Sequence, residues 1–291
     1  MKMTRLLTTL GLLLLLTGCE SDERGPGDNG TGAMATVDGA SLVYEISGEG
    51  ETSLVMIHGW ASHRGAWEAQ VGPLVEAGYR VVTVDLPGHG EASTERVDWR
   101  AAAYATDIAQ LVDHLRLQRA VLVGHSMGGW ISLMAAAEAA EPVVGIVCVD
   151  SLHDVEFEYP EGVLEGLVMQ LETDFDNALA GFVDGMFPPE TNPRLKETVI
   201  SHAGVADRDA LTALMADFGT LDVATMMREA GVPVRCINAG TTFDFAIPTN
   251  VEANRRYADF DAVMIDEVGH YPQIEAPDEF NRLLLEVLSE F

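Results

Sequence analysis

Cysteine and positive charge are both scarce in this sequence. Its 291 residues include only three cysteines, and 17 lysines and arginines stand against 46 aspartates and glutamates, which gives a formal net charge of −29. A chain of that sign repels nucleic acid and anionic lipid, and no basic tract counters it, so we expect no nucleic-acid partner. Clusters of the H-x-x-H or C-x-x-C kind are also missing from the sequence, and we expect no metal ion and no other cofactor.

Two of the cysteines, Cys148 and Cys236, lie within short apolar runs that we interpret as buried strands. A disulfide is permitted outside the cytoplasm. Cysteines on buried strands are more often plain core thiols, however, and we predict free thiols here.

The longest apolar run lies at the N-terminus, where Lys2 and Arg5 precede the stretch Leu6–Leu16. A positive start, an apolar core too short to span a bilayer comfortably and a small-residue end are typical of a secretory signal. The sequence Leu-Thr-Gly-Cys that ends at Cys19 resembles the lipobox of bacterial lipoproteins. The resemblance implies that residues 1–18 are a signal peptide and that Cys19 is lipidated as a membrane anchor. An ordinary signal peptide with a stray cysteine is the alternative.

Residues 19–34 are rich in Gly, Asp, Ser and Thr and have little apolar content, so we predict a flexible tether there. The lipoprotein resemblance places the protein in a bacterial cell envelope, lipid-anchored at the outer membrane or on the periplasmic face. Glu20, instead of an aspartate, follows Cys19, and by the same resemblance this favours the outer membrane.

From Ala35 onward, short apolar runs alternate with amphipathic segments. Asp38-Gly39 supplies the turn of a hairpin whose second arm is Ser41–Ile46. Buried strands are predicted at residues 53–57, 80–84, 120–123, 143–150, 232–238 and 262–265, and helices at residues 66–77, 101–115, 130–137 and 277–288. Such alternation predicts an α/β fold with a mostly parallel sheet, helices on both faces, and ligands at the carboxyl ends of the strands.

The alternation stops between Ser151 and about Glu229. Four helices are predicted there in succession, at residues 163–171, 175–187, 194–203 and 208–218. We predict an inserted helical cap at residues 152–229, within a core formed by residues 35–151 and 230–291. Six apolar cap residues are candidates for a substrate pocket, with packing inside the cap as the alternative: Phe157, Tyr159, Leu167, Met169, Met186 and Phe187.

The stretch Gly124–Gly129, which reads Gly-His-Ser-Met-Gly-Gly, joins an apolar run to a helix. The glycines two before and two after Ser126 remove side chains that would clash on a sharp turn. The N-terminus of the following helix favours negative charge at the same place. We therefore predict that Ser126 is a nucleophile.

Four motifs follow one another at predicted strand ends. They are His58-Gly59-Trp60, Asp85–Gly90, Gly124–Gly129 and Val268-Gly269-His270. In this order they resemble the α/β-hydrolase family from about Ala35 to Phe291. The resemblance implies an α/β-hydrolase fold, His270 as general base, and an oxyanion hole made by the main-chain N–H groups of Trp60 and Met127. His58, His89 and His125 are expected to support loops.

The resemblance offers two places for the acid that orients His270. The family usually places it after the strand that follows the cap, and Asp244, which fits there with one residue more than usual before it, is our first choice for the acid. Other members use a carboxylate at the end of the strand before the cap, where Asp150 stands. Asp150 could instead be a helix N-cap or loop anchor. Asp266 and Glu267 are the remaining candidates.

A serine at the turn, where some relatives carry aspartate, implies an acyl-enzyme mechanism. We therefore expect a serine hydrolase that cleaves a small or medium carboxylic ester or a lactone. One alternative keeps the triad but cleaves a carbon–carbon or amide bond. Another is a catalytically weak member that serves as a binding module of the envelope.

Overall fold

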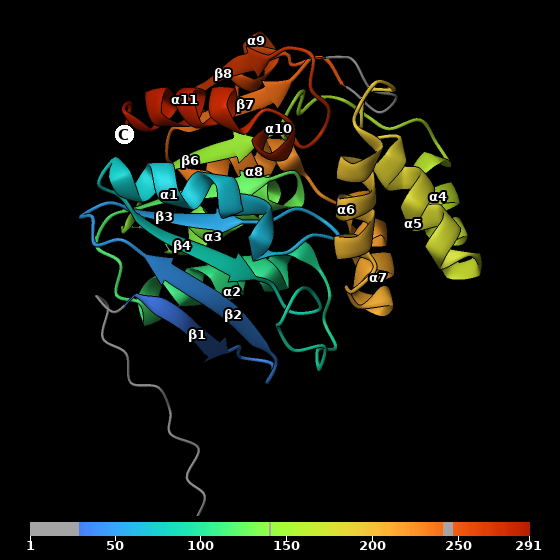
Figure 1. Ribbon diagram of the computed structural model, residues 1–291, viewed down its shortest axis with the longest axis horizontal. Coiled ribbons are helices and arrows are strands. Elements are labelled where there is room, and N and C mark those ends of the chain that lie inside the picture. Colours follow the sequence, from blue (N-terminus) through green and yellow to red (C-terminus); the bar gives the residue numbers. More distant parts are fainter. Residues whose placement is uncertain (1–28, 140, 241–246) are drawn as a thin grey trace, which may run out of the picture.

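A single eight-stranded sheet organises the computed structural model, which describes residues 29–139, 141–240 and 247–291 (Figure 1). The strand order is β1-β2-β4-β3-β5-β6-β7-β8. The strands are β1 Gly30–Ala35, β2 Ser41–Ser47, β3 Ser53–Ile57, β4 Arg80–Asp85, β5 Ala120–His125, β6 Val143–Val149, β7 Val234–Ala239 and β8 Phe260–Ile265. Only the β1–β2 and β2–β4 pairs are antiparallel, so the predicted α/β fold with a mostly parallel sheet is confirmed.

The predicted hairpin forms β1 and β2, but its first strand is longer than expected. Strand β1 begins at Gly30, inside the segment predicted to be a tether, and pairs in register with β2 from Gly30 opposite Ile46. Met34 is buried in the core. Pairing with a neighbouring strand therefore decides the structure of these residues, although their composition is that of a linker.

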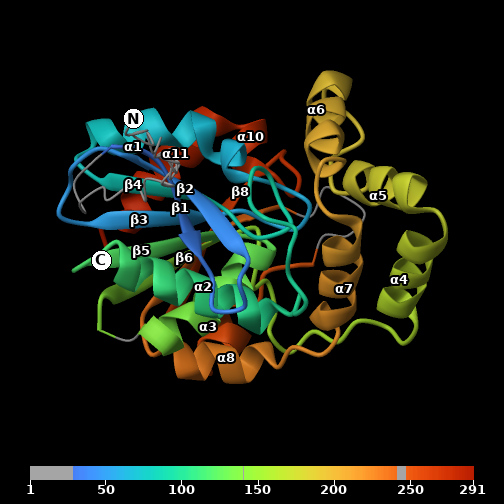
Figure 2. The ribbon, with the colours of Figure 1, turned by 90° about the horizontal axis from the view of Figure 1, so that it is seen from below.

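Helices cover both faces of the sheet (Figure 2). One face carries η1, α1, α10 and α11, and the other carries α2, α3 and α8. Their bounds are η1 Arg64–Trp67, α1 Glu68–Glu76, α2 Ala101–His114, α3 Met127–Ala139, α8 Val223–Ala230, α10 Pro272–Glu275 and α11 Pro277–Leu288; the short α9, Val251–Asn254, lies before β8. Successive residues of β3 go to opposite faces, Leu54 toward Phe280 of α11 and Val55 toward Ile131 of α3.

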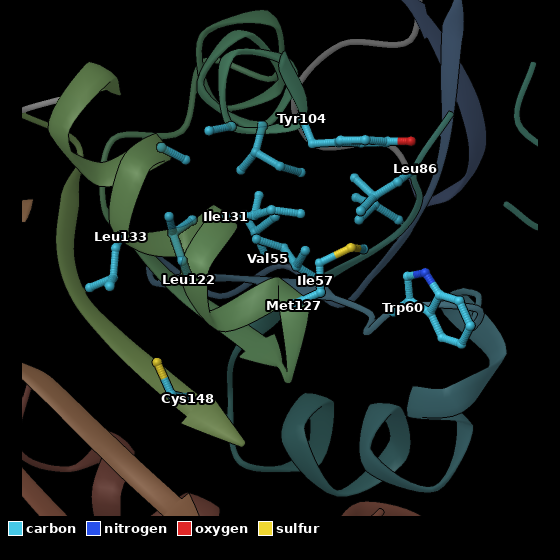
Figure 3. Close-up of a cluster of buried hydrophobic side chains, with 14 of the residues drawn as sticks. Val55, Ile57, Trp60, Leu86, Tyr104, Leu122, Met127, Ile131, Leu133 and Cys148 are labelled. Carbon is cyan, nitrogen blue, oxygen red and sulfur yellow. The ribbon is translucent and has the colours of Figure 1, made fainter. Parts of the chain in front are cut away.

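The core on the α2 and α3 side reaches the carboxyl ends of the strands. Figure 3 shows Ile57, Met127 and Trp60 at that end of the cluster. On the same sheet, Cys148 of β6 stands opposite Cys236 of β7, and both are buried free cysteines, which confirms the predicted core thiols. Burial raises the pKa of the Cys236 thiol well above its ordinary value.

Five helices connect β6 to β7. Four of them stand apart from the sheet (Figure 2): α4 Val163–Thr173, α5 Phe175–Asp184, α6 Pro193–Ala203 and α7 Arg208–Phe218. The fifth, α8, is a helix that the sequence pattern did not predict, and it packs on α3 as part of the core layer although the predicted cap extends to residue 229. Asp222 caps its N-terminus, and the apolar residues Val223, Met226 and Met227 lie on one face at helical spacing.

Among the described residues, no single helix is both long enough and apolar enough to cross a membrane. Helices α7 and α8 reach that length and composition only when taken together, and they meet at an angle of 91°. The predicted signal peptide and Cys19 lie outside the described residues.

Candidate active site

The turn after β5 holds Ser126 in a left-handed backbone conformation, with a φ of 51°. Its N–H donates to the carbonyl of Val149 at 2.9 Å, and its own carbonyl accepts from the N–H of Gly129 at 2.9 Å. A Cβ on Gly124 would lie 2.1 Å from the carbonyl oxygen of Gly128, so this crossing of strand and helix needs glycine. Helix α3 begins at the next residue, Met127. The predicted strand, sharp turn and helix are confirmed.

His270 lies on the turn after β8, and its main chain contacts His125, the residue before Ser126. The Nε2–H of His125 donates to the carbonyl of His270 at 2.7 Å. Burial lowers the pKa of His125 to about 3, so its ring stays neutral. The carboxylate of Glu275 accepts from the N–H groups of Gly269 and Tyr271, at 3.0 and 3.1 Å, and closes the turn around His270.

Asp150, at the end of β6, pairs with the imidazole of His270. Its Oδ2 lies 2.6 Å from the Nδ1 of His270, and its Oδ1 accepts from the N–H of Ala239 at 2.7 Å. Burial favours the neutral acid, but hydrogen bonds from His153 and His270 outweigh it and hold the pKa of Asp150 well below its ordinary range. The carboxyl group is therefore ionised and buried beside the ring.

Asp244, the first choice for the acid, falls in residues 241–246 and lies outside the described residues. Asp266 and Glu267 are exposed at the end of β8. Among the candidates that lie in the described residues, Asp150 is the carboxylate that the structure places against Nδ1 of His270. It is a loop residue, and no helix begins at it.

The loop after β3 brings Trp60 to the turn that holds Ser126. A Cβ on Gly59 would lie only 3.2 Å from the Cβ of Ser126, so the two segments touch. Neither the main-chain N–H of Trp60 nor that of Met127 has a hydrogen-bond partner in the described part of the chain. Two unpaired donors beside Ser126 are what a developing oxyanion requires.

The side chain of Trp60 ties this loop to the cap helices. Its indole N–H donates to the carbonyl of Leu211 in α7 at 2.9 Å, and its ring meets Phe182 of α5 edge to face at 5.3 Å. Neither cap residue was expected from the sequence. Both are apolar residues within helices, where nothing local distinguishes a partner of Trp60 from packing.

His58 and His89 support loops, as predicted. The Nδ1–H of His58 donates to the carbonyl of Gly59 at 2.8 Å, and its Nε2 accepts from the N–H of Leu86 at 3.1 Å. The ring of His89 donates to the carbonyl of Pro87 at 3.2 Å. Burial lowers the pKa of His58 well below its ordinary value and that of His89 to about 4, so both rings are neutral.

Two polar residues that the sequence analysis missed connect the turns. The hydroxyl of Ser151 donates to the carbonyl of Ser126 at 2.9 Å. The side chain of Asn238, at the end of β7, accepts from the N–H of Ser151 at 3.2 Å. Their position directly at strand ends was the available signal, but neither belongs to a motif.

The candidate pocket residues of the cap divide into three groups. Phe187 stacks on Tyr271 at 5.0 Å, and the carbonyl of Met186 accepts from the N–H of His270 at 2.9 Å, so this segment lies against the site. Leu167 is half-buried in α4 and packs against the core cluster. Phe157, Tyr159 and Met169 are 43%, 48% and 59% exposed, and exposed side chains of this kind do not line a closed pocket.

This arrangement can perform acid–base chemistry on a hydroxyl. Because Asp150 occupies Nδ1 of His270, Nε2 is the ring nitrogen that can take a proton from the Ser126 hydroxyl. No group of three or more His, Cys, Asp or Glu side chains in the described ranges is arranged to hold a metal ion.

Both the sequence and the fold of this chain resemble those of known proteins. Residues 54–283 match the sequence model of the alpha/beta hydrolase family. The pimeloyl-[acyl-carrier protein] methyl ester esterase of Yersinia pseudotuberculosis is 28% identical over 260 residues, which cover 86% of this chain and 98% of the relative. A bromoperoxidase structure from Bacillus anthracis superposes with a TM-score of 0.80 at 23% identity, covering 90% of this chain and all of that chain. An esterase structure from Exiguobacterium antarcticum gives 0.78 at 21% identity, covering 88% and 98%.

Proposed function

Because the chain belongs to the alpha/beta hydrolase family, we propose that it is a serine hydrolase that cleaves a small or medium carboxylic ester or a lactone. The observation that carries the proposal is the 2.6 Å contact between Asp150 and His270 beside the strained turn of Ser126. In this proposal Ser126 is the nucleophile, His270 the general base and Asp150 the acid. A carboxylate, an imidazole and a hydroxyl with separate roles are the parts that acyl transfer needs.

In the first half of the reaction, the Ser126 hydroxyl attacks the ester carbonyl while Nε2 of His270 takes its proton. The ionised Asp150 holds the ring through Nδ1 and stabilises the imidazolium that forms. The N–H groups of Trp60 and Met127 donate to the oxyanion, and the start of α3 adds its dipole. The imidazolium then protonates the leaving alcohol, which departs from the acyl-enzyme.

In the second half, water attacks the acyl-enzyme, and His270 again takes and returns the proton. The carboxylic acid leaves and Ser126 regains its hydroxyl. Apart from the substrate and water, neither half requires a group outside the chain. The proposal therefore includes no cofactor.

The relatives favour an ester over the other bonds that the same triad can cleave. The Yersinia pseudotuberculosis relative is named for cleavage of a methyl ester, and a solved neighbour is named an esterase. A small alcohol leaving group is therefore our first choice for this chain. Carbon–carbon or amide cleavage would use the same residues, and product analysis on a β-diketone or an amide separates these possibilities.

The test is hydrolysis of p-nitrophenyl acetate and butyrate by the full-length chain and its Ser126→Ala variant. Loss of the nucleophile should lower kcat/KM by a factor on the order of 10⁴ or more. Ser132→Ala is the matched control, because Ser132 is a buried serine of α3 that donates only to the carbonyl of Gly128. Turnover that survives in Ser126→Ala, or a folded wild type with no turnover of either ester, would contradict the proposal. The latter result would favour a binding module.

We further propose that the protein is attached to the bacterial cell envelope through a lipid on Cys19. The support is the lipobox-like sequence after a positively charged, apolar N-terminus. Incorporation of labelled palmitate during expression, compared between the wild type and Cys19→Ala, tests this. Equal labelling of the two chains would contradict it.

A further inference from the structure

A second histidine reaches the carboxylate of Asp150. Nε2 of His153 lies 3.4 Å from Oδ1 of Asp150, the oxygen that does not contact His270. The His153 side chain is only 13% exposed. Resting on the proposed function, we propose that His153 is a positioning residue, whose Nε2–H donates to Asp150 and fixes the carboxylate that orients His270.

The hydrogen bonds behind His153 determine which of its nitrogens carries the proton. The Oδ1 of Asn238 accepts from Ser151, so its Nδ2 faces Thr249 and donates to that hydroxyl at 3.0 Å. The Thr249 hydroxyl can then donate to Nδ1 of His153, 3.1 Å away. With Nδ1 accepting from Thr249, the ring hydrogen lies on Nε2, directed at the carboxylate. The chain of donors runs from Asn238 through Thr249 and His153 to Asp150.

The backbone around His153 is also held by hydrogen bonds, from the segment that follows Thr249. The N–H of Asn250 donates to the carbonyl of His153 at 2.7 Å, and the buried side chain of Asn254 donates to the carbonyl of Leu152 at 2.6 Å. Leu152 is itself left-handed, with a φ of 52°. A strained backbone held by several polar contacts points to a side chain that must be placed accurately.

The function of this donor follows from the geometry of a carboxylate. The N–H of Ala239 holds Oδ1 along one direction, and His153 supplies a second donor to the same oxygen. Two donors to one oxygen resist rotation of the carboxyl group, so Oδ2 stays aligned with Nδ1 of His270. They also spread the negative charge that faces the imidazolium during the reaction.

The test compares His153→Ala and His153→Gln in the full-length chain with p-nitrophenyl butyrate. The alanine variant should lose about 10-fold in kcat with little change in KM, as expected for loss of one hydrogen bond to a charged group. The acid limb of its kcat/KM profile should move to higher pH, because more negative charge then faces the protonated ring of His270. Among the described residues, the ionisable groups besides His153 that interact with Asp150 are His270, His125, Cys236 and Glu275, and all four are unchanged in both variants.

Glutamine retains an N–H near the position of Nε2, so His153→Gln should recover most of the lost kcat and of the shifted acid limb. His114→Ala, which changes an exposed histidine of α2, is the control and should behave like the wild type. An alanine variant with wild-type kcat and acid limb would overturn the proposal. Equal losses in both variants, matched by equal losses of thermal stability, would show a purely structural role and would overturn it as well.

A second measurement separates this proposal from the proposed function. A fluorophosphonate ester reacts with an activated serine without needing an ester substrate: the Ser126 oxygen bonds to phosphorus, fluoride leaves, and His270 takes the proton. If the wild type is phosphonylated but cleaves no carboxylic ester, the proposed function fails and His153 is judged by the phosphonylation rate. His153→Ala should then react about 10-fold more slowly, and an unchanged rate would overturn the inference.

Discussion

The turns after β5 and β6 both hold a non-glycine residue in the left-handed region, with φ values of 51° at Ser126 and 43° at Asp150. The chain maintains these two conformations in different ways. At Ser126, Gly124 and Gly128 remove the side chains that would obstruct the turn. The segment from Asp150 to His153 contains no glycine, and hydrogen bonds from distant parts of the chain hold it instead.

A non-glycine residue in this region costs about 1–2 kcal/mol. At the β5 turn the cost is met locally, because small residues let strand and helix approach each other. At the β6 turn it is offset by contacts to Ala239, Asn254 and His270, which are distant in the sequence. The first turn should therefore be sensitive to side-chain bulk, and the second to the loss of individual polar partners.

The largest effect is expected from adding one methyl group to the β5 turn. Gly124→Ala would place a Cβ 2.1 Å from the Gly128 carbonyl oxygen, so backbone must move. We expect a loss of about 3 kcal/mol in the free energy of unfolding, measured by urea denaturation. Gly72→Ala is the control, because a Cβ there meets nothing within 4 Å, and it should stabilise helix α1 by about 0.5–1 kcal/mol. Equal stability of the Gly124→Ala variant and the wild type would contradict the account.

Acid should weaken the two turns over different pH ranges. His125 is held neutral, with its pKa lowered from 6.5 to about 3. As pH falls below 6.5 the unfolded chain therefore binds the proton first, and stability falls by about 3 kcal/mol by pH 4. Asp150 is held ionised, with its pKa below 3.8, so its contribution is complete above that pH and is lost only below it.

Urea unfolding of His125→Gln between pH 7 and pH 4.5 tests this separation. The variant should show a shallower loss of stability than the wild type, while His89 continues to supply a similar dependence in both chains. Asp150→Asn should keep the wild-type slope over this range. If the pH dependence of the unfolding free energy changes in Asp150→Asn and not in His125→Gln, the account of these two residues is contradicted.

The smallest effect is expected from Ser151, whose side chain connects the β6 turn to the β5 turn. Ser151→Ala removes the hydroxyl that donates to the carbonyl of Ser126, and it leaves the glycines and Asp150 in place. We expect a loss of about 1 kcal/mol in the free energy of unfolding. Ester turnover should fall only a few-fold. A loss of turnover as large as that of Ser126→Ala would indicate a chemical role for Ser151 and contradict a purely connecting one.

The same contrast explains what could be predicted from sequence. The turn at Ser126 and the histidine at 270 could be identified because the close approach of neighbouring segments requires glycines beside them. The acid could not be identified in the same way, because the ends of the strands before and after the cap both lead to one edge of the sheet. Which carboxylate meets Nδ1 of His270 depends on distances between strands, and no local pattern records them.

Other differences between the sequence-based prediction and the structure have similar causes. Gly30–Ala35 has the composition of a linker, and only pairing with β2 makes it a strand. Helix α8 has an N-cap residue and an apolar face in its sequence, but it is only two turns long and lies at the end of a long helical insertion. The partners of Trp60, Phe182 and Leu211, become visible only when the cap helices are placed over the site.

The most direct test of the central claim is to measure kcat/KM for p-nitrophenyl butyrate with Asp150→Asn and Asp244→Asn in the full-length chain. The account predicts a loss on the order of 10⁴-fold for Asp150→Asn, since the amide would hold His270 in the wrong tautomer, and wild-type activity for Asp244→Asn. Full activity in Asp150→Asn together with a loss of that size in Asp244→Asn would contradict it.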